Sequence, residues 1–411
     1  MINSKVKIIL LIVMMGLPIS VLSETVFEEV RVVYDGGGQD SLSSAAVDID
    51  GNMYITGVGI NGTRGGFIAK YDSYGSEEWV RYPSGSISNG NKMIVDRDGN
   101  AYVVLSGELG KTLKYDSEGN ESVLADPQIV PYGCCGRAVG LVFDNDENNL
   151  YSWASHTIQK ISLDGGAGWA QRLHTASYMV VDVAVDVSGN IYAVGYSLSI
   201  ISGVVVKKLD SSGNVIWSRL LQDEGVSGEV AYGLELDANN NVYVLLQAGS
   251  YEDAGSYTTT SLVASISSDG SVVNNVVLHG TYGYMAGGIK VVDDKVYALT
   301  RKRAQPTAMI VQKLNVDLSL VWSSAEYLIG YRTPQHLDVD GLGNVVVGVN
   351  EMDNKTAIVK FDANGSDLWT IKGEGRNPVL VEFGRGGDVY AADAFLDGFM
   401  YRYDVTQLTC Q

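Results

Sequence analysis

The 411-residue chain contains few prolines, few cysteines and few basic residues. It has 7 prolines and 3 cysteines, and its 29 lysines and arginines stand against 48 aspartates and glutamates. The formal net charge is therefore −19. Binding to a phosphate backbone requires clustered Lys and Arg side chains. We therefore expect no nucleic-acid partner.

Long apolar runs are missing except near the N-terminus. Lys5 and Lys7 precede the apolar run from Ile8 to Leu22, and Val21-x-Ser23 forms a small-residue cleavage site before Glu24. This run of about 15 residues is shorter than the roughly 20 that a spanning helix needs. We interpret residues 1–23 as a secretory signal peptide, with an uncleaved anchor as the alternative. The mature chain should be a monomer without a membrane span, either secreted, periplasmic or at the cell surface.

Common catalytic signatures and helical periodicity are also absent. The four histidines form neither His-x-x-x-His nor His-Glu-x-x-His, and no Gly-x-Ser-x-Gly elbow or phosphate-binding glycine loop occurs. No stretch keeps a helical period over three turns. His174, His279 and His336 fall in or near connections where a lyase or hydrolase could use a base, and this enzyme hypothesis remains open.

One pattern returns about eight times along the chain. It reads Asp-x-x-Gly-Asn-x-Tyr, then a variable stretch, then Lys-x-Asp-x-x-Gly and often Trp, and a clear copy runs from Asp186 to Trp217. Successive copies lie 41–54 residues apart, near the roughly 40–50 residues of one four-stranded propeller blade. The tyrosine position is occupied by Tyr54, Tyr102, Tyr151, Tyr192, Tyr243, Tyr297, Val346 and Tyr390.

Each copy contains short strand-like segments and two kinds of connection. Runs such as 181–186 and 204–209 are rich in β-branched residues and are bounded by Gly, Asn, Asp or Ser, which is typical of strands. Two turns in each copy are short and alike, whereas the other two connections vary in length. In an up-and-down blade the uniform turns lie on one face of the disc and the variable loops on the other. We expect any binding surface on the variable-loop face.

The two ends of the chain suggest how the ring closes. The last copy stops soon after Asp404, before a fourth strand, whereas an additional strand-like segment at 27–33 opens the chain. If this segment completes the last blade, two open sheet edges disappear. The sequence therefore predicts an all-β fold, with residues 24–411 forming a single β-propeller of four-stranded antiparallel blades. We expect eight blades with closure by the N-terminal strand, and seven blades are the alternative.

The pattern resembles the SBBP-type β-propeller repeat of bacterial secreted proteins. The match covers about residues 25–408 and is best in 46–57, 183–195, 206–217 and 358–369. The third and sixth copies depart from it at the first turn. The resemblance implies a propeller fold and an exported location. It carries no catalytic residues, because the shared motif consists of turn and core positions.

Two first turns resemble the beginning of a calcium loop. They read Asp48-x-Asp50-Gly51 and Asp96-x-Asp98-Gly99. Neither is followed by the bidentate Glu that an EF-hand requires. Turn-capping by the aspartates is therefore the competing interpretation, and we expect no cofactor unless calcium binds here.

Aromatic residues provide the candidate recognition surface. Tyrosine offers a large contact area with a polar tip. Tryptophans at fixed repeat positions favour packing between blades, whereas Trp153 breaks the pattern and is predicted to be a surface aromatic. Packing of the tyrosines over the channel is the alternative to recognition. The tyrosines in the variable loops of copies five to seven are Tyr251, Tyr257, Tyr282, Tyr284, Tyr327 and Tyr331.

The cysteines permit one local disulfide. Cys134 and Cys135 lie in the connection between the second and third copies, on the predicted variable-loop face, whereas Cys410 lies near the opposite face. Export permits disulfides. We predict a vicinal Cys134–Cys135 disulfide with Cys410 unpaired, and three free thiols are the alternative.

Together these features predict a non-enzymatic exported propeller that binds a protein or a glycan through its variable-loop face. A polysaccharide lyase or glycoside hydrolase with a site at the channel mouth is the first alternative. A structural surface-display module is the second.

Overall fold

The computed structural model describes most of the chain between residues 24 and 408. It forms strands and turns, and none of the described residues belongs to a helix. The described ranges are 24–33, 41–61, 63–83, 92–105, 111–125, 138–154, 156–166, 168–173, 178–197, 203–221, 230–251, 257–278, 284–302, 307–330, 336–351, 355–372, 378–384, 387–393 and 399–408.

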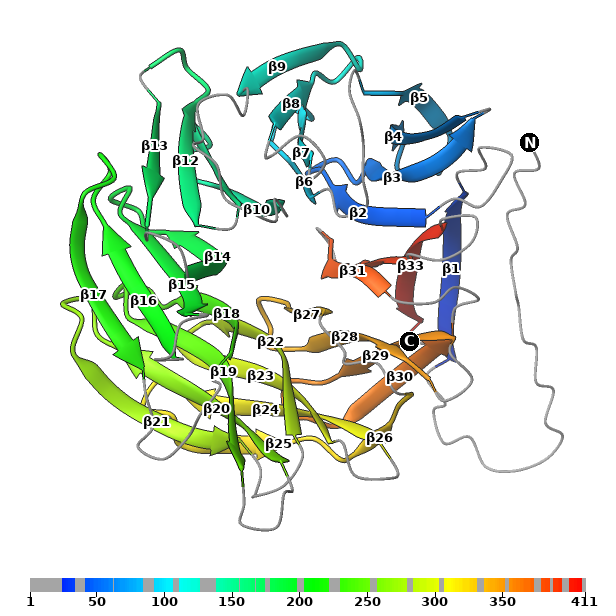
Figure 1. Ribbon diagram of the computed structural model, residues 1–411. Coiled ribbons are helices and arrows are strands. Elements are labelled where there is room, and N and C mark those ends of the chain that lie inside the picture. Colours follow the sequence, from blue (N-terminus) through cyan, green and yellow to red (C-terminus); the bar gives the residue numbers. More distant parts are fainter. Residues whose placement is uncertain are drawn as a thin grey trace, which may run out of the picture.

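The strands form eight sheets, which are arranged around a common axis (Figure 1). The first sheets in chain order contain β2 (Ser41–Val47), β3 (Met53–Asn61), β4 (Thr63–Tyr71) and β5 (Glu77–Arg81); β6 (Lys92–Val95), β7 (Ala101–Leu105), β8 (Lys111–Tyr115) and β9 (Glu121–Ala125); β10 (Ala138–Phe143), β11 (Asn149–Ala154), β12 (Thr157–Ser162) and β13 (Trp169–Arg172); and β14 (Tyr178–Val185), β15 (Ile191–Ser197), β16 (Val204–Leu209) and β17 (Val215–Leu221). The next three contain β18 (Val230–Leu236), β19 (Val242–Tyr251), β20 (Tyr257–Ile266) and β21 (Val272–Leu278); β22 (Tyr284–Val292), β23 (Lys295–Lys302), β24 (Ala308–Asn315), β25 (Leu320–Ser323) and β26 (Tyr327–Leu328); and β27 (His336–Val339), β28 (Val345–Asn350), β29 (Thr356–Phe361) and β30 (Asp367–Lys372). The remaining sheet contains β31 (Pro378–Phe383), β32 (Val389–Asp393), β33 (Phe399–Leu408) and β1 (Glu24–Val33).

The order of strands within each sheet is that of a propeller blade. Neighbouring strands are antiparallel and follow one another in sequence, and β26 is added beside β24. The first strand of each sheet lies next to the first strand of the following sheet, so that these strands surround the axis, and β31 lies next to β2. The predicted all-β propeller of four-stranded antiparallel blades is confirmed.

The sheet that contains the C-terminal strands also contains the N-terminal one. β1 pairs antiparallel with β33 from Glu24 opposite Leu408 to Val33 opposite Phe399. The additional strand-like segment at 27–33, noted in the sequence, lies within β1. The sheet order is therefore β1-β33-β32-β31, with residues from the two ends of the chain in one ladder.

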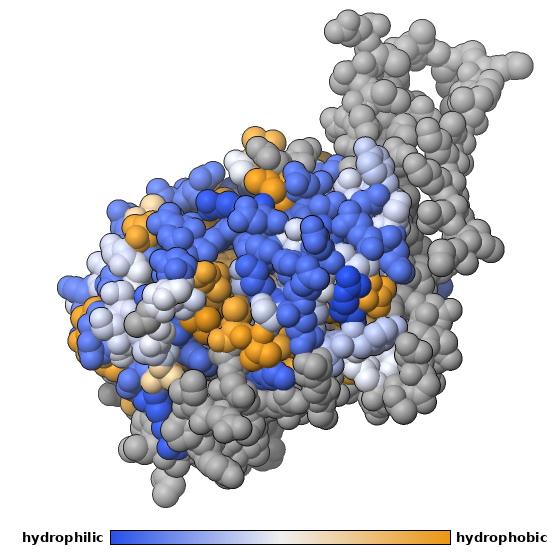
Figure 2. Space-filling view, turned by 90° about the horizontal axis from the view of Figure 1, so that it is seen from above, coloured by the Kyte–Doolittle hydropathy of each residue, from blue (hydrophilic) through white to orange (hydrophobic). Residues whose placement is uncertain are grey.

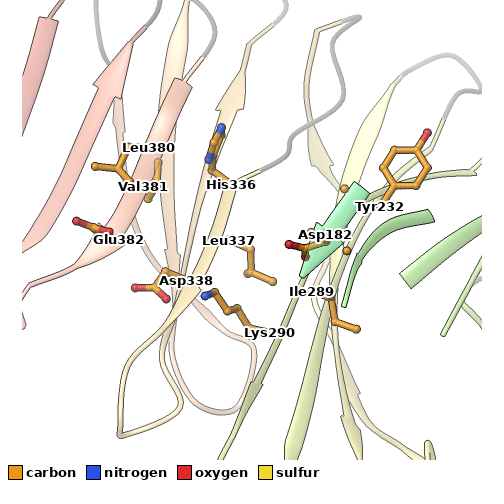
Figure 3. A pocket seen from close by; sticks show the side chains of 13 residues that line it. Asp182, Tyr232, Ile289, Lys290, His336, Leu337, Asp338, Leu380, Val381 and Glu382 are labelled. Atoms are coloured by element: carbon orange, nitrogen blue, oxygen red, sulfur yellow. The ribbon is translucent and has the colours of Figure 1, made fainter. Parts of the chain in front are cut away.

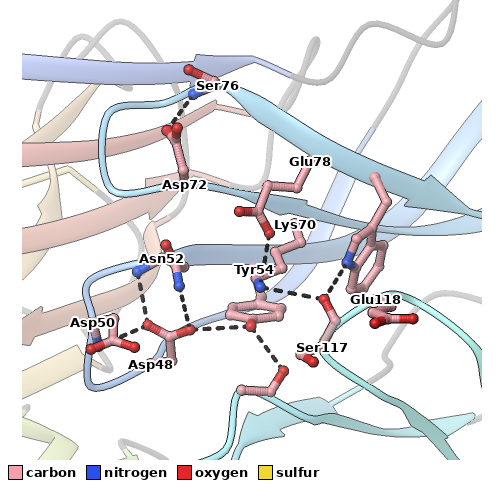
Figure 4. A network of polar contacts seen from close by, with 12 residues as sticks. Asp48, Asp50, Asn52, Tyr54, Lys70, Asp72, Ser76, Glu78, Ser117 and Glu118 are labelled. Atoms are coloured by element: carbon pink, nitrogen blue, oxygen red, sulfur yellow. Dashed lines mark hydrogen bonds and ion pairs between the residues drawn. The ribbon is translucent and has the colours of Figure 1, made fainter.

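The repeated tryptophan holds adjacent blades together. Trp79 Nε1 donates to the carbonyl of Ser117 in the next blade over 3.1 Å, and Lys70 Nζ donates to the same carbonyl over 3.4 Å (Figure 4). The equivalent indole donates across the next interface at Trp169, Trp217 and Trp322. The predicted packing role is confirmed for Trp79, Trp169, Trp217 and Trp322, because each of these indoles donates to the third turn of the neighbouring blade.

The core consists of apolar layers between adjacent sheets. The repeat tyrosines are almost completely buried, and Val346, which replaces the tyrosine in the seventh copy, is 0 % exposed. Hydrophilic residues dominate the side of the molecule shown in Figure 2, with apolar patches between them. In the described part of the chain, no helix is long and apolar enough to cross a membrane.

Candidate functional site

The innermost strands carry β-bulges where they approach the axis. The register shifts between Val180 and Asp182 in β14, between Ala231 and Gly233 in β18, and between Ala286 and Ile289 in β22. Similar shifts occur in β2, β10 and β31. A bulge re-aims side chains and increases the local twist. The residues that follow it are therefore not placed by simple alternation.

Eight residues on the innermost strands form what we call the axial ring. Each is the cross-strand partner of the residue at the repeat tyrosine position, for example Ala46 opposite Tyr54 and Glu382 opposite Tyr390. Four consecutive members are charged and four are apolar, so the ring has two different sides. In order, the members are Ala46, Ile94, Val142, Ala184, Glu235, Lys290, Asp338 and Glu382.

A cavity of about 300 Å³ lies on the charged side (Figure 3). Its lining comes from β14, β18, β22, β27 and β31, and glycines at Gly233, Gly287 and Gly288 leave room because they have no side chains. His336 is the first residue of β27. The cavity therefore reaches the beginning of this strand, which directly follows a variable connection. The ionisable residues that line it are Asp182, Lys290, His336, Asp338 and Glu382, and Tyr232 completes the polar lining.

Most carboxylates around this cavity have defined partners. Asp182 accepts hydrogen bonds from the backbone N–H of Leu234 over 3.1 Å and of Val183 over 2.9 Å. Asp338 accepts one from the N–H of Phe383 over 2.8 Å. Lys290 Nζ lies 3.5 Å from Glu235 Oε1. These contacts tie β14 to β18, β18 to β22 and β27 to β31.

Glu382 and His336 differ from these residues. Within the described part of the chain, neither side chain has a hydrogen bond or an ion pair, although both line the cavity. Burial raises the pKa of Glu382 to about 8, and the charge of Asp338 adds to the effect. Burial lowers the pKa of His336 to about 3, with the positive charge of Lys92 acting in the same direction. Near neutral pH the imidazole is therefore neutral and the Glu382 carboxyl largely protonated.

The carboxyl groups of Glu235 and Asp182 also resist ionisation. Burial raises the pKa of Glu235 to about 7, against the opposing attraction of Lys290, and raises the pKa of Asp182 to about 6. The negative charge of Glu235 in turn raises the pKa of Lys290. Clustered groups with shifted pKa values in one cavity are typical of functional sites.

The predicted surface tryptophan is a core residue, and this prediction was wrong. Trp153 is only 5 % exposed, and its Nε1 donates to the carbonyl of Val181 in the next blade over 3.3 Å. Its ring lies over Gly140, where an added Cβ would be 2.1 Å from the indole. Because Gly140 has no side chain, it leaves the space that the indole fills. The deviation of Trp153 from the repeat is therefore explained by packing in the core.

Of the predicted tyrosine surface, one side chain is described. Tyr327 is half-buried, and its hydroxyl donates to Glu351 Oε1 over 2.9 Å. Tyr251 and Tyr257 face each other across the backbone ladder of β19 and β20. The side chains of Tyr251, Tyr257 and Tyr284 lie outside the described part of the structure, as do Tyr282, Tyr331, Cys134 and Cys135 entirely.

The candidate calcium aspartates cap turns. Asp48 Oδ1 accepts from the N–H groups of Asp50 and Asn52, and Oδ2 accepts from Asn52 Nδ2 and the Tyr54 hydroxyl, over 2.8–3.1 Å (Figure 4). The same four bonds surround Asp96. Among the described residues, no group of three or more His, Cys, Asp or Glu side chains could hold a metal ion.

Replacing Asp48 with alanine should lower the free energy of unfolding by about 2–3 kcal/mol, because the backbone amides of Asp50 and Asn52 and the side-chain amide of Asn52 lose their acceptor. Asp50→Ala is the matched control, since the side chain of Asp50 is exposed, and it should change stability by less than about 0.5 kcal/mol. Urea unfolding measures both. A calcium-induced rise in Tm that both substitutions abolish would instead identify a calcium site.

Sequence reasoning missed the charged side of the axial ring. Its signal is present in the repeat alignment, where Glu235, Lys290, Asp338 and Glu382 take positions that are apolar in the first four copies. Ionisable side chains on a strand that borders the core are costly unless they are paired or serve a purpose. The repeat-breaking residues of the innermost strands are therefore better candidates than the aromatic residues of the loops.

Comparison with known proteins places the fold but no family. No family model and no curated protein matches the chain. The structure of Sqt1 from Chaetomium thermophilum is similar with a TM-score of 0.63 at 12% identity, over 93% of this chain and 100% of that chain. A chain in the Mitotic Checkpoint Complex gives a TM-score of 0.52 at 11% identity, over 77% and 86%. The WD40 β-propeller domain of Doa1 gives 0.47 at 11% identity, over 93% and 97%. At such identities the likeness to Sqt1 and the checkpoint chain is one of fold.

Proposed function

We propose that the protein is an exported, non-enzymatic β-propeller that binds a protein or glycan partner through its variable-loop face and the adjoining channel mouth. The observation that carries this proposal is the separation of roles among its polar residues. Residues that make the repeat, such as Asp48, Lys70 and Trp79, are engaged in turns and blade contacts. Residues that break it, such as Asp338 and Glu382, line a cavity at the axis.

The cavity favours binding over catalysis because its histidine lacks the partners of a general base. A catalytic imidazole is normally oriented by a carboxylate or a comparable acceptor. In the described part of the structure, His336 contacts no such group, and the charge that acts on it is that of Lys92. A base with a pKa of about 3 is also too weak for catalysis near neutral pH.

A polysaccharide lyase or glycoside hydrolase remains the second candidate because of one observation. Glu235 and Glu382 both have pKa values raised by burial, and a protonated carboxyl is the usual acid in glycoside cleavage. Incubation with a panel of polysaccharides would establish this alternative if new reducing ends or unsaturated products were released and if Glu382→Gln abolished this release. Absence of any ligand in all screens would leave the surface-display module.

The proposal includes an architecture and a compartment. We propose eight blades closed by β1, supported by the eight sheets and the ladder between β1 and β33. Removal of residues 24–33 should then lower Tm by exposing the edge of β33. We also propose that residues 1–23 direct export and that the chain is related to SBBP-type propellers, in keeping with its repeat pattern. The similar fold of a chain in the Mitotic Checkpoint Complex supports a protein partner.

The proposed function is tested with mature chain 24–411 against extracellular protein and glycan panels. Tyr327→Ala changes the described member of the predicted tyrosine surface, and Tyr74→Ala is its control because Tyr74 is 70% exposed in a uniform turn. A ligand should lose at least about tenfold in affinity with Tyr327→Ala and remain unchanged with Tyr74→Ala. A ligand that responds only to Tyr74→Ala would place recognition on the opposite face.

A further inference from the structure

The two sides of the axial ring differ in charge. Ala46, Ile94, Val142 and Ala184 have hydrocarbon side chains that are partly buried and pack against the apolar layers between blades. The other side and the adjoining positions carry four carboxyl groups against the two amines of Lys92 and Lys290. The carboxyl groups belong to Asp182, Glu235, Asp338 and Glu382.

Among the described residues, two neighbouring carboxyl groups without an ion pair lie on β27 and β31. Asp338 and Glu382 occupy neighbouring positions of the axial ring, and the charge of Asp338 acts on Glu382. Asp338 accepts a single backbone N–H, whereas Glu382 accepts no hydrogen bond from the described residues. Lys290 lies in the same cavity but forms its ion pair with Glu235. The charge of Lys290 acts on both carboxyl groups. Within the described residues, however, neither group forms an ion pair, and both lie beside an open space.

We propose that the channel binds a primary ammonium group on an aliphatic chain, with Asp338 and Glu382 as its acceptors. An ammonium has three N–H donors, which suits two adjacent carboxylates. The apolar lining of the cavity at Ile289, Leu337 and Leu380 can contact the methylene groups, and the cavity of about 300 Å³ is large enough for such a ligand. This inference deepens the proposed function, because the ammonium would be the part of the ligand that enters the channel.

The ligand can be a free amine or a lysine side chain of a protein, since both present the same group. A metal ion fits less well, because the described residues offer no cluster of three His, Cys, Asp or Glu ligands. A neutral polyol would bring no positive charge to either carboxyl group. An anion would be repelled by the carboxylates that line the cavity.

Binding should be linked to proton release. A cation beside Glu382 favours its ionised form, so part of the carboxyl population, with a pKa of about 8 in the free protein, loses its proton at pH 7. Asp182, Asp338 and Lys290 line the same cavity, with Glu235 close to it. Neutral His336 does not titrate between pH 6 and 8, because its pKa is about 3. Affinity should therefore rise with pH through this interval.

Calorimetry with n-butylamine tests the inference on the mature chain, in two buffers of different ionisation enthalpy. We expect saturable binding with proton release, at least tenfold weaker in Glu382→Gln and in Asp338→Asn. Glu118→Gln is the control because Glu118 is exposed in a turn, and its affinity should equal that of the wild type. n-Butanol, which lacks the charge, should not compete.

A second arm uses a short peptide with one lysine, with and without Nζ acetylation. Binding of the free lysine peptide alone assigns the site to a protein side chain, and binding of butylamine alone assigns it to a small amine. No saturable binding of either, or equal affinity in wild type and Glu382→Gln, overturns the inference. Thermal melting of Glu382→Gln confirms that the variant is folded. If neither amine binds but a partner still binds the variable-loop face, the proposed function stands without this inference. If an amine binds but no partner is found, only the proposed function is contradicted.

Discussion

Replacing Gly365 with alanine should destabilise the propeller by about 2–5 kcal/mol, one of the largest effects expected from a single methyl group. Gly365 has φ +84 in the third turn of its blade, a conformation that costs an alanine about 1–2 kcal/mol. Its added Cβ would lie 2.7 Å from Trp322 Cε3 of the preceding blade, and such overpacking costs about 1–3 kcal/mol more. The indole has little freedom to move, because its Nε1 donates to Ala363 over 2.9 Å. Urea unfolding measures the loss.

Gly165→Ala separates the two contributions. Gly165 has φ +86, yet an added Cβ would meet no atom within 4 Å. Its cost should therefore be that of the backbone alone, about 1–2 kcal/mol. The double variant Trp322→Ala/Gly365→Ala should show a favourable coupling, because the clash disappears with the ring. Equal destabilisation by Gly165→Ala and Gly365→Ala would mean that the tryptophan does not constrain the glycine.

These glycines explain why the fold could be predicted from the sequence. The glycine of Asp-x-x-Gly serves a turn with positive φ and, at positions such as Gly119 and Gly365, also receives a neighbouring indole. The aspartate caps the turn, and the tryptophan spans the blade interface. One physical requirement that recurs at a fixed spacing produces a repeated pattern, and the pattern indicates both the blade and its neighbour.

The candidate site could not be predicted in the same way. Asp182 follows a bulge, so its direction does not follow from alternation along β14. Glu382 and Asp338 lie 44 positions apart in the sequence and are brought together because β27 and β31 are the innermost strands of adjacent sheets. Trp153 was misinterpreted for a related reason, since the space that accepts it depends on Gly140 in the adjacent strand. Departures from a repeat show where something differs, but only three-dimensional neighbours show whether the difference is packing or a site.

Substituting Glu382 with glutamine should stabilise the protein increasingly as pH rises from about 4.5 to 8. The pKa of this carboxyl is raised from 4.5 to about 8 in the folded state. Below the unfolded pKa both states are protonated and the residue carries no penalty. Between the unfolded and the folded pKa the unfolded state is ionised while the folded state keeps its proton, so stability falls as pH rises and levels off above pH 8. At about 1.4 kcal/mol per pKa unit the loss has an upper bound of roughly 5 kcal/mol, and the partly open channel reduces it to about 2–3 kcal/mol.

The same sign applies to the two neighbouring carboxyl groups over narrower intervals. The pKa values of Glu235 and Asp182 are raised to about 7 and about 6, so their penalties are complete at lower pH than that of Glu382. Wild-type stability should therefore decline between pH 5 and 8, and Glu382→Gln should remove most of the decline that persists above pH 7. Urea unfolding at unit pH intervals measures this difference, with exposed Glu118→Gln as a control that should follow the wild type. If Glu382→Gln also followed the wild type across this range, Glu382 would be ionised and solvated in the folded protein, and the channel would lack the strained carboxyl that makes it a candidate cation site.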